Sequence, residues 1–133
     1  KQMYDKGEID WLGSPTDSIP LAAIPSYKKD DVLNISPLAG VYYYAFNTEA
    51  EPFNNVNIRK AFAMAINRQG IVDNITQAEQ APAMALVPPS IFEENAEGYF
   101  KDNDIEEAKK LMEKGLEELG LSEMPTIKLS YNT

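Results

Sequence analysis

The strongest β-strand signal in the chain is a short aromatic segment at residues 41–46. Its residues, Val-Tyr-Tyr-Tyr-Ala-Phe, are mostly aromatic or β-branched, and such side chains favour the pleated surface of a β-strand. Successive side chains of a strand point to opposite faces, so Val41, Tyr43 and Ala45 share one face and the even-numbered residues share the other. Both faces carry apolar bulk, and we therefore expect both to be covered, by protein or by a ligand.

Two longer segments have the apolar spacing of amphipathic helices. The first begins after Asn54 or Asn55, either of which can cap it. The second opens at Asp104, which has capping-box spacing with Glu107, and it ends at Gly120. The expected inward faces are Ile58, Ala61, Phe62, Ala65 and Ile66 in the first helix and Ile105, Ala108, Leu111, Met112, Leu116 and Leu119 in the second.

Shorter elements fill the rest of the chain. Gly7 is expected to end a first helix and Pro20 to begin a short one. Another short helix follows Asn67, and the proline-rich residues 80–91 are expected to be irregular. Asp17 or Ser18 is expected to cap the helix that begins at Pro20. In the helix after Asn67, the expected inward residues are Ile71, Val72 and Ile75. Further strands are expected at 9–13, 32–35 and 126–131. Helices and strands together predict an α/β fold with a mixed sheet and packed helices.

Length and charge narrow the possible partners. The 133 residues fit one domain, and the formal charge of −9 with only 12 basic residues argues against a nucleic-acid partner. Most of the negative charge lies in residues 93–123, as in a solvated helix face; a docking surface for a basic partner is the alternative. No apolar run approaches the roughly 20 residues that cross a bilayer.

Catalytic and metal-binding chemistry has little support. The chain has no cysteine and no histidine, which excludes disulfides, thiolate or imidazole metal ligands and Ser-His or Cys-His nucleophile pairs. Its adjacent carboxylates, such as Glu106 and Glu107, do not face each other on a helix. Glycine-rich phosphate loops are missing as well. We expect no enzyme, no metal and no cofactor.

The three consecutive tyrosines are the strongest binding candidates. They combine rigid aromatic surface with hydroxyl groups, which suits the lining of a binding site. A central strand with aromatic packing on both sides explains the same composition equally well. The residues alone leave both interpretations open.

Several motifs resemble one family in the same order along the chain. Tyr-Tyr-Tyr-Ala-Phe-Asn-Thr at residues 42–48 and Pro-Phe-Asn-Asn-Val-Asn-Ile-Arg-Lys-Ala at 52–61 resemble the family-5 solute-binding proteins, receptors for oligopeptides, dipeptides and nickel. Ala-Ile-Asn-Arg at 65–68 matches a helix junction of that family, with Asn67 where Asp is commoner. Gly-Glu-Ile-Asp at 7–10 is similar to a further segment. The aromatic segment at 41–46, called the tyrosine segment below, most resembles the corresponding segment of the oligopeptide receptors of Gram-positive bacteria.

The resemblance implies a piece of a two-lobed, periplasmic-binding-protein-like fold of class II. Residues 1–40 would be the tail of the first lobe, 41–47 a strand crossing between lobes, and 48–133 the beginning of the second lobe, folding as one compact unit. The opening does not resemble a signal peptide, and the sequence stops two residues after the last predicted strand. We therefore expect a fragment of a longer protein.

The implied function is capture of extracellular oligopeptides and their delivery to an ABC transporter permease. The cleft-facing residues would be Leu38, Gly40, Val41, Tyr43 and Ala45. Some family members have a carboxylate where this chain has Ala45, which puts in doubt a salt bridge from this strand to a basic ligand. The acidic residue that captures the peptide amino terminus would lie beyond the chain, so the fragment alone is expected to bind peptide weakly or not at all.

The implied location is extracytoplasmic, as a cell-surface lipoprotein in Gram-positive bacteria or in the periplasm. Contact with the membrane would come only through a lipid anchor outside this fragment. Two other interpretations stay open: an independent acidic α/β interaction module, and a dipeptide or nickel receptor of the same family.

Overall fold

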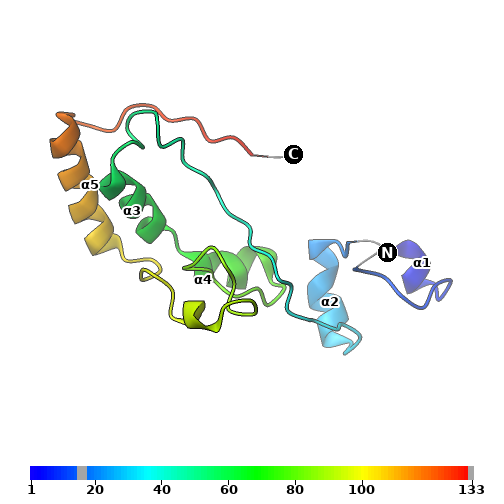
Figure 1. Cartoon of the computed structure of the whole chain (residues 1–133). Coiled ribbons are helices and arrows are strands. Elements are labelled where there is room, and N and C mark those ends of the chain that lie inside the picture. Colours follow the sequence, from blue (N-terminus) through cyan, green and yellow to red (C-terminus); the bar gives the residue numbers. More distant parts are fainter. Residues whose placement is uncertain (15–17, 132–133) are drawn as a thin grey trace. The chain divides into compact units, whose positions relative to one another are not determined.

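A computed structural model describes residues 1–14 and 18–131 (Figure 1). The chain divides into two compact units, one formed by residues 1–38 and 69–82 and the other by 39–68 and 83–133. Asp17, one of the two predicted caps, lies outside the described residues. No helix in the part that the structure describes is long and apolar enough to cross a membrane.

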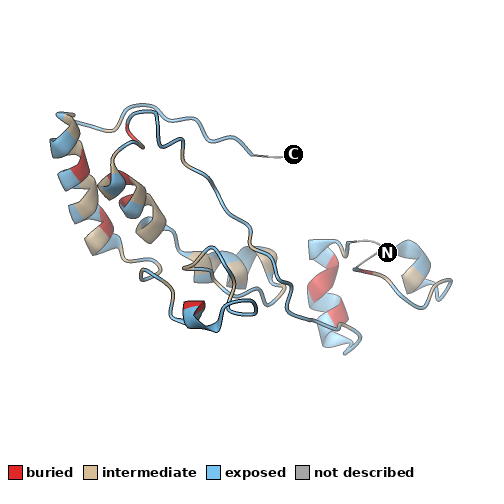
Figure 2. Cartoon of the chain, in the orientation of Figure 1, coloured by how far each residue is buried: buried red, intermediate tan, exposed pale blue. Residues whose placement is uncertain are grey.

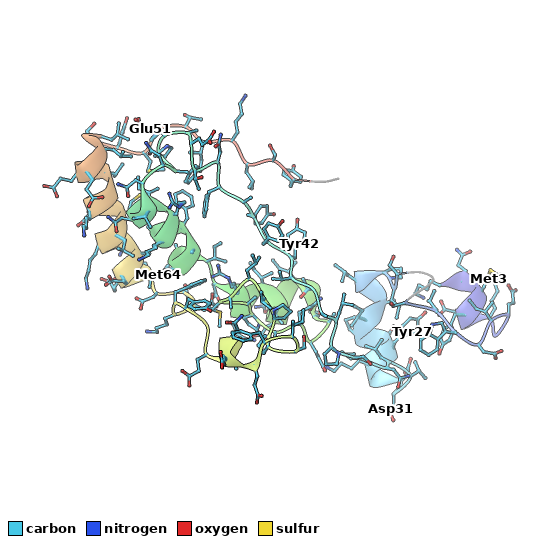
Figure 3. The ribbon with its side chains drawn as sticks, viewed as in Figure 1. Met3, Tyr27, Asp31, Tyr42, Glu51 and Met64 are labelled. Carbon is cyan, nitrogen blue, oxygen red and sulfur yellow. The ribbon has the colours of Figure 1, made fainter. Side chains whose placement is uncertain are left out.

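The first unit is built around the helix α2, Ile24–Lys29. It also contains α1 (Gln2–Asp5), a 3₁₀ turn η1 (Leu21–Ala23), most of α4 (Arg68–Ile71) and the π-helix η2 (Val72–Thr76). The buried Tyr27 of α2 donates a hydrogen bond of 2.6 Å to Asp5, and its ring meets the ring of Tyr4 edge to face at 5.6 Å (Figure 3). This contact joins the amino-terminal helix to α2.

Two helix ends in this unit lie at residues that the sequence predicted. Gly7 adopts a positive φ of 70° just after α1, as expected for a residue that ends a helix. Pro20 precedes η1, and Pro25 lies in the first turn of α2, where its missing N–H is not needed.

The second unit is dominated by two helices packed against each other, α3 (Val56–Ala65) and α5 (Ile105–Leu119). Asn55 caps α3 by accepting from the N–H groups of Asn57 and Ile58, which confirms that prediction. Asp104 caps α5 and Gly120 ends it in the left-handed conformation, both as predicted. The buried residues of the pair lie on the faces turned toward each other (Figure 2).

The buried set in this helix pair is smaller than the two predicted apolar faces. Ile58, Ala61 and Ala108 are buried, whereas Ala65, Ile66 and Ile105 are exposed. Ile66 lies after the end of α3 with an extended backbone (ψ 133°), so the helical spacing no longer applies to it.

A buried asparagine holds together the irregular segment that precedes α5. Asn95, in the 3₁₀ turn η3 (Glu93–Ala96), donates to the carbonyl of Val87 at 2.8 Å and accepts from the hydroxyl of Tyr99 at 2.9 Å. The N–H of Tyr99 also donates to the carbonyl of Met84. Residues 80–91 are irregular, as predicted.

The predicted strands at 9–13, 32–35, 41–46 and 126–131 do not form within residues 1–14 and 18–131. A strand requires ladder hydrogen bonds to a neighbouring strand, and alternation of side chains within one segment does not supply that neighbour. The mixed sheet is therefore not formed by the described residues.

The predicted inward face after Asn67 is wrong in two of its three residues. Ile71 and Ile75 are 42% and 67% exposed, while Val72 is half-buried. The chain widens into a π-helix from Val72 to Thr76, so the spacing of an α-helix does not hold there.

Candidate functional site

A cluster of three phenylalanines anchors the tyrosine segment, residues 41–46, to α3 within the second unit. Phe46, at the end of the segment, lies 4.8 Å from Phe53 and 6.0 Å from Phe62 between ring centroids. Phe53 and Phe62 are 5.3 Å apart in an edge-to-face arrangement. Since Phe62 belongs to α3, the carboxyl end of the tyrosine segment is held against that helix.

The tyrosines themselves extend away from this anchor as an exposed aromatic surface. Tyr42, Tyr43 and Tyr44 are 74%, 64% and 52% exposed. The rings of Tyr42 and Tyr44 meet edge to face at 5.7 Å, as expected where alternate residues share a side (Figure 3 labels Tyr42). A hydrogen bond with Tyr42 raises the pKa of the Tyr44 hydroxyl above its ordinary value.

The residues predicted from the sequence to contact a ligand are mostly exposed. Leu38 is 81% exposed, Gly40, Tyr43 and Ala45 are exposed, and Val41 is half-buried. Leu38 belongs to the first unit and the other four to the second. Their role as a binding site stays a prediction.

Two hollows occur elsewhere in the described residues. One, of about 230 Å³, is in the second unit, and the other, of about 300 Å³, is in the first. The former is lined by Ala61, Phe62, Ala65, Ile105, Ala108, Lys109 and Met112, and the latter by Pro25, Lys28, Val72, Asp73, Gln77 and Glu79. Neither lining includes a residue of the predicted site.

A glutamate side chain links α3 and α5, the helix pair that supports the phenylalanine cluster. Glu118 of α5 accepts hydrogen bonds of 2.8 Å from the side-chain amides of Asn55 and Asn57. These bonds, the one from Asn55 first, lower the pKa of the Glu118 carboxyl group. Asn55 therefore caps α3 with its oxygen and binds α5 with its nitrogen.

Gly115 lies one turn before that carboxylate, and its importance was missed from the sequence. A Cβ atom at this position would lie 2.5 Å from Cγ1 of Ile58 and 3.1 Å from Oδ1 of Asn55. The lack of a side chain thus permits the close approach of α5 to the first turn of α3. Its spacing of seven residues from Ala108 was the available signal, because that spacing keeps a residue on the same helix face.

Arg68 is a second residue whose contacts within the fold the sequence did not predict. Its guanidinium donates to the carbonyl of Ala63 at 2.8 Å and to Asp102 at 3.0 Å, and it lies 4.9 Å from the centre of the Phe100 ring. The side chains of Arg68 and Asp102 are only 20% and 16% exposed. Arg68 thereby fastens the end of α3 to the segment that leads into α5.

The acidic side chains do not form a cation site in the described part of the chain. No group of three or more acidic residues comes together there in a way that could hold a metal ion. The geometry offers an exposed aromatic surface anchored on a helix pair, and rigid aromatic side chains with hydroxyl groups suit contact with a ligand.

Comparison with known proteins gives a consistent family assignment. Residues 1–133 match the model of the bacterial extracellular solute-binding proteins, family 5. The chain is 56% identical to the oligopeptide-binding protein OppA of Bacillus subtilis (strain 168), over 98% of this chain and 25% of that protein. It is 38% identical to the dipeptide-binding protein DppE of the same organism, over 99% of this chain and 24% of that protein.

A more distant relative agrees with these two. The chain is 32% identical to the periplasmic oligopeptide-binding protein OppA of Escherichia coli (strain K12), over 98% of this chain and 24% of that protein. The chain thus spans about a quarter of the length of the curated relatives it matches. The resemblance recognised in the tyrosine and helix-junction motifs is confirmed, and the chain belongs to the family-5 bacterial extracellular solute-binding proteins.

Proposed function

We propose that this chain is the middle part of an oligopeptide receptor that captures peptides outside the cytoplasm and delivers them to an ABC transporter. The observation that carries the proposal is the 56% identity to an oligopeptide-binding protein over nearly the whole chain. The exposed tyrosine segment on its helical support agrees with a binding role. The proposed role is binding without turnover.

In the complete receptor, residues 1–40 end the first lobe, residues 41–47 cross between lobes and residues 48–133 begin the second. Segments 41–46 and 126–131 then find their ladder partners in polypeptide outside this chain and form a mixed sheet. Their exposed side chains support this, since Tyr42, Leu129 and Tyr131 are 74%, 66% and 71% exposed. Contiguous exposed apolar patches often mark surfaces that contact other polypeptide.

The peptide contacts in this proposal come from one face of the crossing segment. Tyr43 supplies rigid aromatic surface, Val41 and Ala45 share its face, and Gly40 and Leu38 approach the cleft. Ala45 offers no charge, so selectivity for a basic ligand side chain does not come from this position. Side-chain pockets that keep water accept many sequences, because water replaces specific contacts.

The proposed partners are the permease subunits of a peptide ABC transporter. Closure of two lobes over the peptide would present the loaded receptor to the permease. The proposed location is the cell surface or the periplasm, with membrane contact through a lipid anchor outside residues 1–133.

Calorimetric titration of the complete receptor tests this function. Peptides of two, three, four and five residues are titrated separately at the same ionic strength. The proposal expects peptides of three to five residues to bind more tightly than dipeptides. A strict preference for dipeptides would favour the second candidate, a dipeptide receptor, which the 38% identity to DppE supports. No binding of any peptide would refute both.

A further inference from the structure

The first compact unit is assembled from two stretches that are far apart in the sequence. Residues 1–38 meet residues 69–82. On one side of the contact lie Pro25 and Lys28 of α2, and on the other lie η2 and the turn that follows it. The two sides enclose the hollow of about 300 Å³ described above.

An ion pair closes this contact. The Lys28 ammonium group binds the Glu79 carboxylate, across 51 positions of sequence. Their side chains are 53% and 50% exposed, so the pair lies at the rim of the hollow and not in a core. Asp73 is a further acidic residue in the lining.

The turn that carries Glu79 has a specific backbone. Gln77 and Glu79 have positive φ angles of 53° and 60° although neither is a glycine. The N–H of Gln77 donates to the carbonyl of Val72 at 2.9 Å, and the hydroxyl of Thr76 donates to the side chain of Gln80 at 2.8 Å. Side-chain and backbone hydrogen bonds thus shape the turn that presents Glu79 to Lys28.

We infer that the Lys28–Glu79 ion pair is a contact between the two lobes that forms when the receptor closes. The inference rests on the proposed function, in which residues 1–40 belong to the first lobe and residues 48–133 to the second. Lys28 and Glu79 then come from different lobes, and the hollow beneath them is part of the surface between lobes. A bond made only in the closed state shifts the equilibrium toward closure and strengthens peptide binding.

The expected effect is modest because the pair is exposed. Ion pairs of this kind contribute little in high dielectric, which corresponds to a change in affinity of up to about fivefold. The effect must also weaken at high salt, since the screening length falls to roughly 3 Å at 1 M. A reversal of charge at Lys28 adds repulsion from Glu79 and the nearby Asp73.

The test uses the complete receptor with the variants Lys28→Glu and Glu79→Lys, and the double variant that exchanges the two charges. Lys29→Glu is the matched control, because it makes the same charge change one residue away. Affinity for a tetrapeptide is measured by calorimetry at low and at 1 M salt, and stability without peptide is measured by urea unfolding. We expect each single variant to bind about three- to fivefold more weakly at low salt, and the double variant and Lys29→Glu to bind like the wild type. Stability without peptide should stay unchanged.

Three outcomes would overturn the inference. If Lys28→Glu lowers stability without peptide but leaves affinity unchanged, the contact lies within one lobe. If the single variants change neither quantity, or the double variant fails to recover affinity, the pair does not contribute to closure. Failure of the wild type to bind any peptide would instead refute the proposed function, so the two failures are distinguishable.

Discussion

Replacement of Gly115 by alanine should loosen the pairing of α3 and α5, against the general preference of helices for alanine. In an exposed helix interior this change stabilises by about 1 kcal/mol. Here the new Cβ atom would lie 2.5 Å from Cγ1 of Ile58, which is completely buried, and 3.1 Å from its backbone nitrogen. A methyl group has no room at such distances.

The expected change in the free energy of unfolding follows from the side chains that the new methyl group would displace. The Ile58 side chain is completely buried and must shift, and overpacking of a well-packed site costs about 1–3 kcal/mol. Oδ1 of Asn55 is also 3.1 Å from the new atom, and it holds the cap of α3 with bonds of 2.8 Å and 3.3 Å to the N–H groups of Asn57 and Ile58. Loss of a cap costs about 1 kcal/mol. After the gain in helix propensity, which offsets the loss of the cap, we expect a net loss of about 1–3 kcal/mol.

Urea unfolding of the chain, followed by circular dichroism at the helical band, measures the change. Lys114→Ala is the matched control, because its side chain is 63% exposed on the same turn of α5, and it should alter stability by less than about 0.5 kcal/mol. A stabilisation by Gly115→Ala of about 1 kcal/mol, as propensity alone gives, would refute the close approach of the two helices.

Three further predictions concern single side chains. Arg68→Lys should destabilise the second unit by roughly 1–2 kcal/mol in urea unfolding, because an ammonium group cannot both stack on Phe100 and bridge Ala63 to Asp102; equal stability would contradict that account. Glu118 has a lowered pKa in the folded chain, so its stabilising effect is present above the unfolded pKa and is lost as pH falls through the folded value. The stability advantage of the wild type over Glu118→Gln should therefore decline once the pH falls below the ordinary glutamate pKa of about 4.3 and vanish below the folded value; an advantage that does not change with pH would show another origin. Tyr43→Ala should weaken peptide binding by the complete receptor roughly tenfold in calorimetry, with Tyr42→Phe as control on the opposite face; unchanged affinity for Tyr43→Ala would exclude Tyr43 from the site.

The sequence predicted those parts of the fold that depend on neighbouring residues. Asp104 was identified as a cap, Asn55 as one of two candidate caps, and Gly7 and Gly120 as helix ends, because capping is a contact within one turn of the chain. The family was identified from the same kind of short, ordered motifs. These features are local, and their signals are written in adjacent residues.

Contacts between distant residues were not predictable in the same way. The partner of Arg68 is 34 positions away, and nothing near Arg68 indicates Asp102. The strand at 41–46 was predicted from its own side chains, but a ladder depends on a neighbour that residues 1–14 and 18–131 do not supply. For the candidate site, alternation correctly placed Tyr42 and Tyr44 on one side, whereas contact of Tyr43 with a ligand depends on polypeptide outside this chain.

The most direct test of the account is a paired calorimetric titration of one tetrapeptide into the complete receptor and into residues 1–133 alone. The proposal that this chain contributes part of a cleft predicts tight binding by the complete receptor and weak or no binding by the isolated chain. Equally tight binding by the isolated chain would contradict the divided site, and no binding by either would contradict the proposed peptide receptor.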